Sequence, residues 1–209
     1  MDISVYNKNT FKYIFDFVYS PDYRILTILY IKDEPMYTVT QAAFIIAVYK
    51  LADLKQWKDF HPTLLYVCVL NLLYNYITAN YQLWKLHPDF FSNHSITDIM
   101  NSIILLPAMS FLFLSHYPRN KEKKAIVLYY IKWIIGSVLI ESIFVVTDRI
   151  SFHNGYHFWM EPFFYTLMFT FIRLHYKRPL LTYVLSCLVV LFFIWYFNVP
   201  IGTPIDERN

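Results

Sequence analysis

SFHNGYHFWMEP, residues 151–162, separates two long apolar runs in the second half of the chain. His153, His157 and Glu161 follow one another at intervals of four residues in this stretch. Glu141 lies ten residues before Ser151, inside the preceding apolar run. A carboxylate within a membrane-length segment costs several kcal/mol unless it faces a protein interior or a water-filled cavity. Glu141 therefore indicates a functional site.

The composition is typical of an integral membrane protein. The chain has 209 residues, of which 57% are hydrophobic and 16% are charged, whereas soluble domains carry about 25% charged residues. Its 19 Tyr and 5 Trp fit this class, because both residue types favour membrane interfaces. We expect the lipid bilayer to surround the chain, and we expect no nucleic acid partner.

The pattern predicts an all-α fold, a bundle of about six transmembrane helices over residues 36–198. A helix is expected because backbone groups in lipid must satisfy their own hydrogen bonds. Residues 1–35 mix aromatic and charged side chains and are predicted to lie at the interface, and residues 199–209 form a tail. The six expected spans are residues 37–53, 62–78, 96–115, 125–147, 157–174 and 180–197.

Two prolines affect these expected helices. Pro107 falls inside the third span and predicts a kink. Pro162 leaves the start of the fifth span open. If that helix begins near Glu161, His157 belongs to the preceding loop, and its spacing from Glu161 has no helical meaning.

Connections that are rich in Lys and Arg alternate along the chain with connections that hold few of them. The connections after the first, third and fifth spans are rich in them, whereas the second and fourth connections and the tail hold only Lys85, Arg149 and Arg208. Rich connections are cytoplasmic by the positive-inside rule. We therefore expect a multi-pass protein of the cell membrane with its C-terminus outside.

Polar side chains within the spans collect toward the outer membrane face. At about 1.5 Å of rise per residue, those of four helices fall within roughly 10 Å of the outer boundary. The candidate ligand-binding residues are Asn75, Asp98, Asn101, Glu141, His153, His157 and Glu161. The alternative is that they make interhelical hydrogen bonds that fix helix packing.

The sequence identifies no metal site and no cofactor. Cys68 and Cys187 both lie inside apolar runs and lack the spacing of a metal or redox motif. The chain also lacks a zinc-binding HExxH motif, a GxSxG motif and a phosphate-binding glycine loop.

Several short motifs together resemble an uncharacterised family of small multi-pass membrane proteins of spore-forming bacteria. They are LWKLHP at 83–88, HYP at 116–118, IE at 140–141, HNG at 153–155 and RLHYKRP at 173–179. The likeness covers roughly residues 47–185, so the N-terminal 35 residues lie outside it. The resemblance implies a class and a location but no mechanism.

Three functions remain open from the sequence. The first is binding or transport of a cation or small polar ligand in an outward-facing acidic pocket. The second is a membrane-embedded enzyme in which Glu141 and either Asp98 or Glu161 form an acid and base pair. The third is a structural subunit whose aromatic surface holds a protein partner.

Overall fold

The computed structural model describes residues 35–88, 93–119 and 121–208. The predicted interfacial region, residues 1–35, therefore lies almost wholly outside the described residues. Within them the chain forms six long helical segments, which confirms the all-α prediction. The segments lie within a few residues of the expected ranges: α3 (Met36–Leu51), α4 (Trp57–Ile77), the continuous run α5 (His94–Met100), η2 (Asn101–Leu105) and α6 (Leu106–Ser115), then α7 (Lys123–Val146), α8 (Glu161–Lys177) and α9 (Pro179–Tyr196).

Three of these segments are long and apolar enough to cross a membrane: His94–Ser115, Lys123–Val146 and Pro179–Tyr196. Of the others, α3 is apolar but has only 16 residues. The 21 residues of α4 include two charged ones near its start, and α8 combines 17 residues with Glu161 and Arg173. The structure thus supports three apolar spans directly, and the other three crossings stay a prediction.

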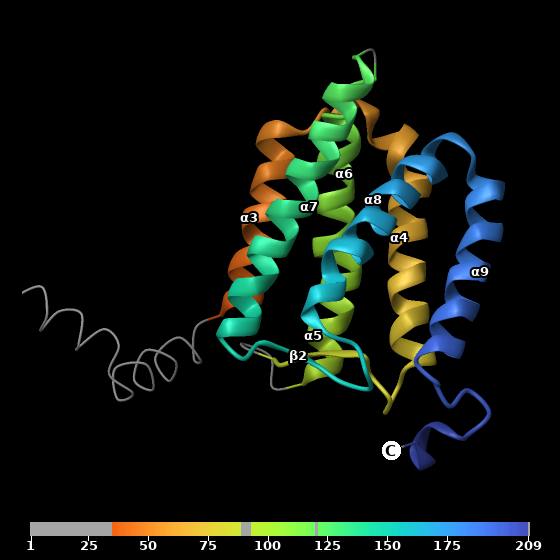
Figure 1. The fold of residues 1–209 in the computed structure, drawn as a ribbon. Coiled ribbons are helices and arrows are strands. Elements are labelled where there is room, and N and C mark those ends of the chain that lie inside the picture. The colour runs from red at the N-terminus through yellow and green to blue at the C-terminus, as the bar shows by residue number, and fades with distance from the viewer. Residues whose placement is uncertain (1–34, 89–92, 120, 209) are drawn as a thin grey trace, which may run out of the picture.

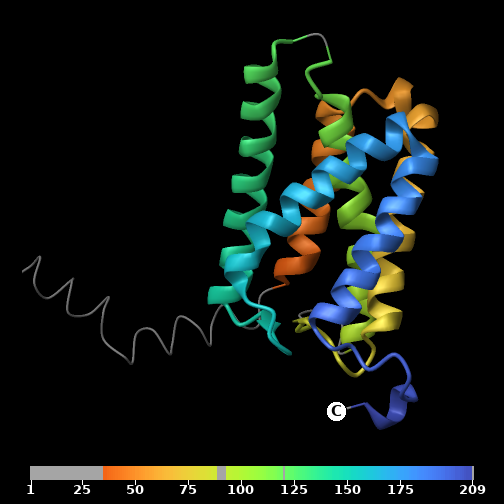
Figure 2. The same ribbon diagram turned by 45° about the vertical axis from the view of Figure 1, so that its right-hand side comes forward.

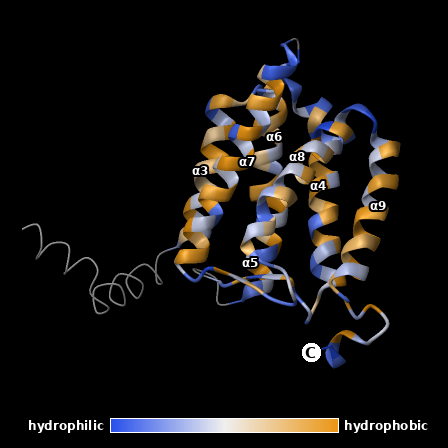
Figure 3. Cartoon of the chain, in the orientation of Figure 1, coloured by the Kyte–Doolittle hydropathy of each residue, from blue (hydrophilic) through white to orange (hydrophobic). Residues whose placement is uncertain are grey.

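The helices stand side by side, and α8 crosses the bundle obliquely from the lower half of α7 to the top of α9 (Figures 1 and 2). One end of the bundle carries β2, the start of α5 and the C-terminal tail, and the other carries the turn between α6 and α7. Figure 3 shows apolar residues along the helix flanks, with polar residues concentrated at both ends. This distribution suits a bilayer around the flanks.

Pro107 alters the third span in a specific way. The five residues before α6 form a π-helix, η2, in which the Leu106 N–H bonds the Asn101 carbonyl, five residues earlier. Proline has no N–H to donate, and its ring clashes with the carbonyl four residues earlier. The wider turn before Pro107 removes this conflict, so the expected disturbance takes the form of a π-turn.

The sequence did not predict a small antiparallel sheet that joins two distant connections. Strand β1 (Trp84–Leu86) pairs with β2 (Ile150–Phe152), and Lys85 lies opposite Ser151. Backbone bonds from His153 to Leu83 and from His87 to Arg149, both 2.8 Å, continue the pairing at each end. The first residues of the 151–162 stretch are therefore strand.

Another part of that stretch is turn and helix start. Asn154 and Gly155 have positive φ values of 53° and 83°, which turn the chain after β2. A short 3-10 turn, η3 (Phe158–Met160), then leads into α8, whose first residue is Glu161. Pro162 suits this position, because a proline in the first turn of a helix loses no hydrogen bond.

Aromatic packing fills the half of the bundle away from the sheet. Phe113 is fully buried, and its ring contacts five others, with centroid separations from 4.8 Å to 6.0 Å. These rings belong to Tyr117, Tyr129, Tyr130, Trp133 and Phe169. The guanidinium of Arg173 lies 4.0 Å from the Tyr117 ring centroid, a cation–π contact that places a charge against the edge of this core.

We expect Phe113→Ala to lower the free energy of unfolding by about 3 kcal/mol. This value is at the low end for a buried Phe, because lipid already solvates apolar side chains of the unfolded chain, while the lost packing remains. Chemical unfolding in detergent micelles measures the change. Phe192→Ala is the matched control, since Phe192 is 51% exposed on α9. Equal losses in the two variants would contradict the assigned core.

Candidate functional site

An open polar cleft of about 990 Å³ lies at the end of the bundle that carries the sheet. Its walls come from the last turns of α4, the first turns of α5, β1, the turn after β2 and the C-terminal tail. The polar and charged lining residues are Asn75, Asn80, Gln82, Lys85, His94, Ser95, Asp98, His153, Asn154, Asp206 and Arg208. Both signs of charge therefore face the same space.

The most enclosed charged group of this cleft is Asp98. Its residue is 8% exposed, and its Oδ2 lies 3.7 Å from Nδ1 of His94, one helical turn earlier. The Lys85 ammonium also acts on this carboxylate. Asn75 lies half-buried in the same cleft. An anion with cationic neighbours and a nearby amide can orient a positively charged ligand group.

The C-terminal tail closes one side of the cleft. Arg208 donates hydrogen bonds to the carbonyl of Ile77, at 2.7 Å, and to that of Thr203, at 2.9 Å. The Asn80 amide donates to the Ile205 carbonyl at 2.9 Å. The Ile77 carbonyl is one of those that α4 leaves without an intrahelical partner, and a cation stabilises that end of the helix dipole. The predicted tail is thus a docked element of the site.

A chain of three side chains runs from the sheet to the cleft. His87 Nε2 and Ser151 Oγ are 2.8 Å apart, and Ser151 Oγ and His153 Nε2 are also 2.8 Å apart. Ser151 and His87 are brought together by the strand pairing. His153 therefore reaches the cleft in an orientation set by the sheet.

A second polar group, the buried carboxyl pair, lies between α7 and α8 and consists of Glu141 and Glu161. Glu141 is 9% exposed and Glu161 is 3% exposed. The two carboxyl groups interact with each other, and the hydroxyls of Tyr165 and Tyr156 interact with Glu141 and Glu161 respectively. Neither glutamate lines the polar cleft.

The hydroxyl of Tyr156 shows how enclosed the surroundings of this pair are. Tyr156 is 2% exposed. Burial, followed by the nearby carboxylate of Glu161, raises the pKa of Tyr156. Its hydroxyl and Glu141 Oε2 are both buried without a hydrogen-bond partner among the described residues, so the contacts around the pair leave polar atoms unsatisfied.

The predicted ligand-binding residues thus divide into separate groups. Asn75, Asp98 and His153 line the cleft, whereas Glu141 and Glu161 form the pair. Asn101 belongs to the π-helix and lines neither place. His157 is exposed and precedes η3. Of the two alternatives for His157, the structure shows the second: α8 begins only at Glu161, so His157 lies in the connection before it and its spacing from Glu161 has no helical meaning.

Sequence reasoning missed Lys85, Arg208 and Tyr156 as site residues. Lys85 and Arg208 are the isolated basic residues of segments that otherwise lack Lys and Arg. This pattern was used only to predict the topology. Tyr156 belongs to the polar stretch 151–162, but nothing in its sequence surroundings marks a buried hydroxyl. No three His, Cys, Asp or Glu side chains come together as metal ligands within the described ranges.

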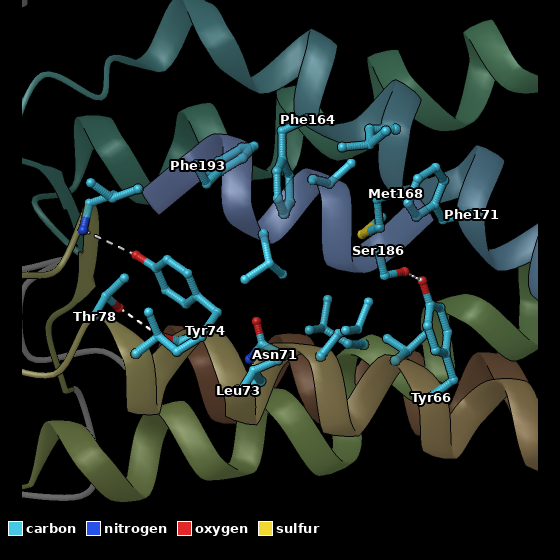
Figure 4. A pocket seen from close by; sticks show the side chains of 18 of the residues that line it. Tyr66, Asn71, Leu73, Tyr74, Thr78, Phe164, Met168, Phe171, Ser186 and Phe193 are labelled. Atoms are coloured by element: carbon cyan, nitrogen blue, oxygen red, sulfur yellow. Dashed lines mark hydrogen bonds between the residues drawn. The ribbon is translucent and has the colours of Figure 1, made fainter. Parts of the chain in front are cut away.

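A third feature is an apolar cavity of about 170 Å³ between α4, α8 and α9 (Figure 4). Polar side chains that line the cavity already make hydrogen bonds with other residues. The hydroxyls of Tyr66 and Ser186 are 2.7 Å apart, and the Asn71 amide donates to Ser102 Oγ at 2.7 Å. This cavity therefore offers apolar walls to any occupant.

Comparison of the chain with protein-family models, with characterised proteins and with solved structures finds no match. The resemblance to small multi-pass membrane proteins of spore-forming bacteria consequently stays a prediction. The function has to be inferred from the residues of the polar cleft and of the buried carboxyl pair.

Proposed function

We propose that this chain is a multi-pass membrane protein that binds a small polar ligand carrying both a positive and a negative charge. The observation that carries the proposal is the polar cleft, in which Lys85 and Arg208 share one space with Asp98 and Asp206. A zwitterion such as an amino acid or a short peptide can satisfy both signs at once.

The charge arrangement favours a zwitterion over a simple cation. A cation near Asp98 is repelled by Lys85, whose charge already acts on that carboxylate. A ligand with its own carboxylate gives Lys85 a partner while its amine faces Asp98. Asn75 and His153 add hydrogen-bonding groups along the same wall.

Six membrane crossings are part of the proposal. Alongside the three apolar segments, the 21 residues of α4 reach about 30 Å, the thickness of the hydrocarbon core. The shorter α3 packs against α6, and α8 packs against α4 and α7. The cleft lies at the end with few basic connections, which the positive-inside rule assigns to the outside.

A reporter fused after Asn209 should be outside, and one inserted between Asn120 and Lys121 should be cytoplasmic. The described C-terminal tail and the start of α7 lie at opposite ends of the bundle (Figure 1), and the basic residues around the second position favour the cytoplasm. Alkaline phosphatase and green fluorescent protein fusions distinguish the two sides. Finding both reporters on one side would contradict the six-crossing arrangement.

Asp98→Asn should weaken binding of a zwitterionic ligand at least tenfold, equivalent to about 1.4 kcal/mol, because it removes the anion that faces the ligand amine. Scintillation proximity measurements with a panel of labelled amino acids and dipeptides give the affinities. Asp59→Asn is the control, since Asp59 is exposed in the first turn of α4, at the other end of the bundle.

Lys85→Gln should also weaken the binding of zwitterions, but it should leave the binding of ligands that carry only an amine unchanged. If simple cations bind the parent as tightly as amino acids do, the zwitterion assignment is wrong. If every member of the panel binds Asp98→Asn as well as it binds the parent, the cleft is not the site.

An acid and base enzyme is a second candidate, favoured by the interaction between Glu141 and Glu161. Two interacting carboxyl groups can hold one proton between them and so provide one acid and one base. The pair lines neither the polar cleft nor the apolar cavity. Ligand binding in the cleft is therefore the better supported function.

A further inference from the structure

The buried carboxyl pair is the strongest feature that the proposed ligand site does not use. Glu141 lies in the last two turns of α7 and Glu161 is the first residue of α8, so helix packing, not local sequence, brings them together. Both are at least nine-tenths buried. Two interacting negative charges at this depth would be strongly unfavourable.

Among the described residues, no cation is one of the groups that act on the pair. The groups that act on Glu141 are Glu161 and Tyr165, and those that act on Glu161 are Glu141 and Tyr156. Beyond this shell, Tyr74 of α4 acts on Tyr156, and Asp98 of α5 acts on Tyr74. These are hydroxyls and carboxyls. Arg149, the next basic residue along from α7, donates to the Pro88 carbonyl.

Two buried polar atoms without hydrogen-bond partners indicate that the pair binds a further species. Glu141 Oε2 and the Tyr156 hydroxyl are buried without a hydrogen-bond partner among the described residues. Ionised carboxylates only accept hydrogen bonds, so two of them cannot bond each other. One added proton turns one carboxyl into a donor and leaves its partner as an acceptor.

We propose that Glu141 and Glu161 form a proton-binding site that holds one proton between the two carboxyl groups inside the bundle. The proton stays on the pair at neutral pH, where exposed carboxyls are ionised. The Tyr156 hydroxyl, which acts on Glu161, can donate a hydrogen bond to the remaining carboxylate. The site binds and releases the proton as the pair gains or loses access to water, which is a common use of carboxyls in membrane bundles.

Infrared spectroscopy of the purified full-length protein in lipid nanodiscs tests this directly. The parent at pH 7 should show the carbonyl band of one protonated carboxylic acid, and the band should shift in deuterium oxide. Glu141→Gln and Glu161→Gln should each shift its frequency, because the remaining carboxylic acid then lies beside a neutral amide instead of a carboxylate, and the double variant should remove the band. Glutamine keeps the size and hydrogen-bonding capacity of each side chain.

Glu122→Gln and Glu207→Gln are matched controls, since both glutamates are exposed, and both should leave the band unchanged. Thermal unfolding checks that each variant is folded, and the parent spectrum stands even if one variant is not. No acid band in the parent would overturn the proposal. So would a band that the double variant retains or that neither single variant shifts, or one that sodium chloride but not choline chloride abolishes, which would indicate a cation site.

Discussion

The antiparallel pairing of Trp84–Leu86 with Ile150–Phe152 is the interaction on which the functional end of the molecule depends. It fastens the connection between α4 and α5 to the connection between α7 and α8, although the two lie more than sixty residues apart in sequence. The strands place Lys85 and His153 on the cleft and set the turn that buries Tyr156. A Trp84 ring stacked on Tyr74 at 3.8 Å reinforces the same junction.

Most of the helical architecture could be predicted from the sequence, because apolar runs of membrane length have few alternatives to helix. The strands could not, since three-residue segments such as Trp84–Leu86 are too short to show an alternating pattern. Depth arguments placed Asp98, Glu141 and Glu161 at one level of the bundle. They give height along a helix but not the direction in which a side chain faces, so they merged the cleft with the carboxyl pair.

Hydroxyl side chains contribute less to helix association than their number suggests. Ser102, Ser110 and Thr182 each donate to the carbonyl four residues earlier in their own helix. Bonds between helices are few, and they include Tyr66 with Ser186 and Thr63 with His175. Aromatic rings around Phe113 provide much of the remaining contact. Asn71 adds one more bond between helices, to Ser102 of the neighbouring segment.

The π-turn at Asn101–Leu105 gives the third segment two rotational phases. Before the turn, Asp98 faces the cleft; after it, Met109 and Phe113 face the aromatic core. One residue of an α-helix corresponds to about 100° of rotation, so a chain shorter by one residue here could keep only one of these faces in place. The wide turn thus allows one continuous helical segment to present a polar surface to the cleft and an apolar surface to the aromatic core.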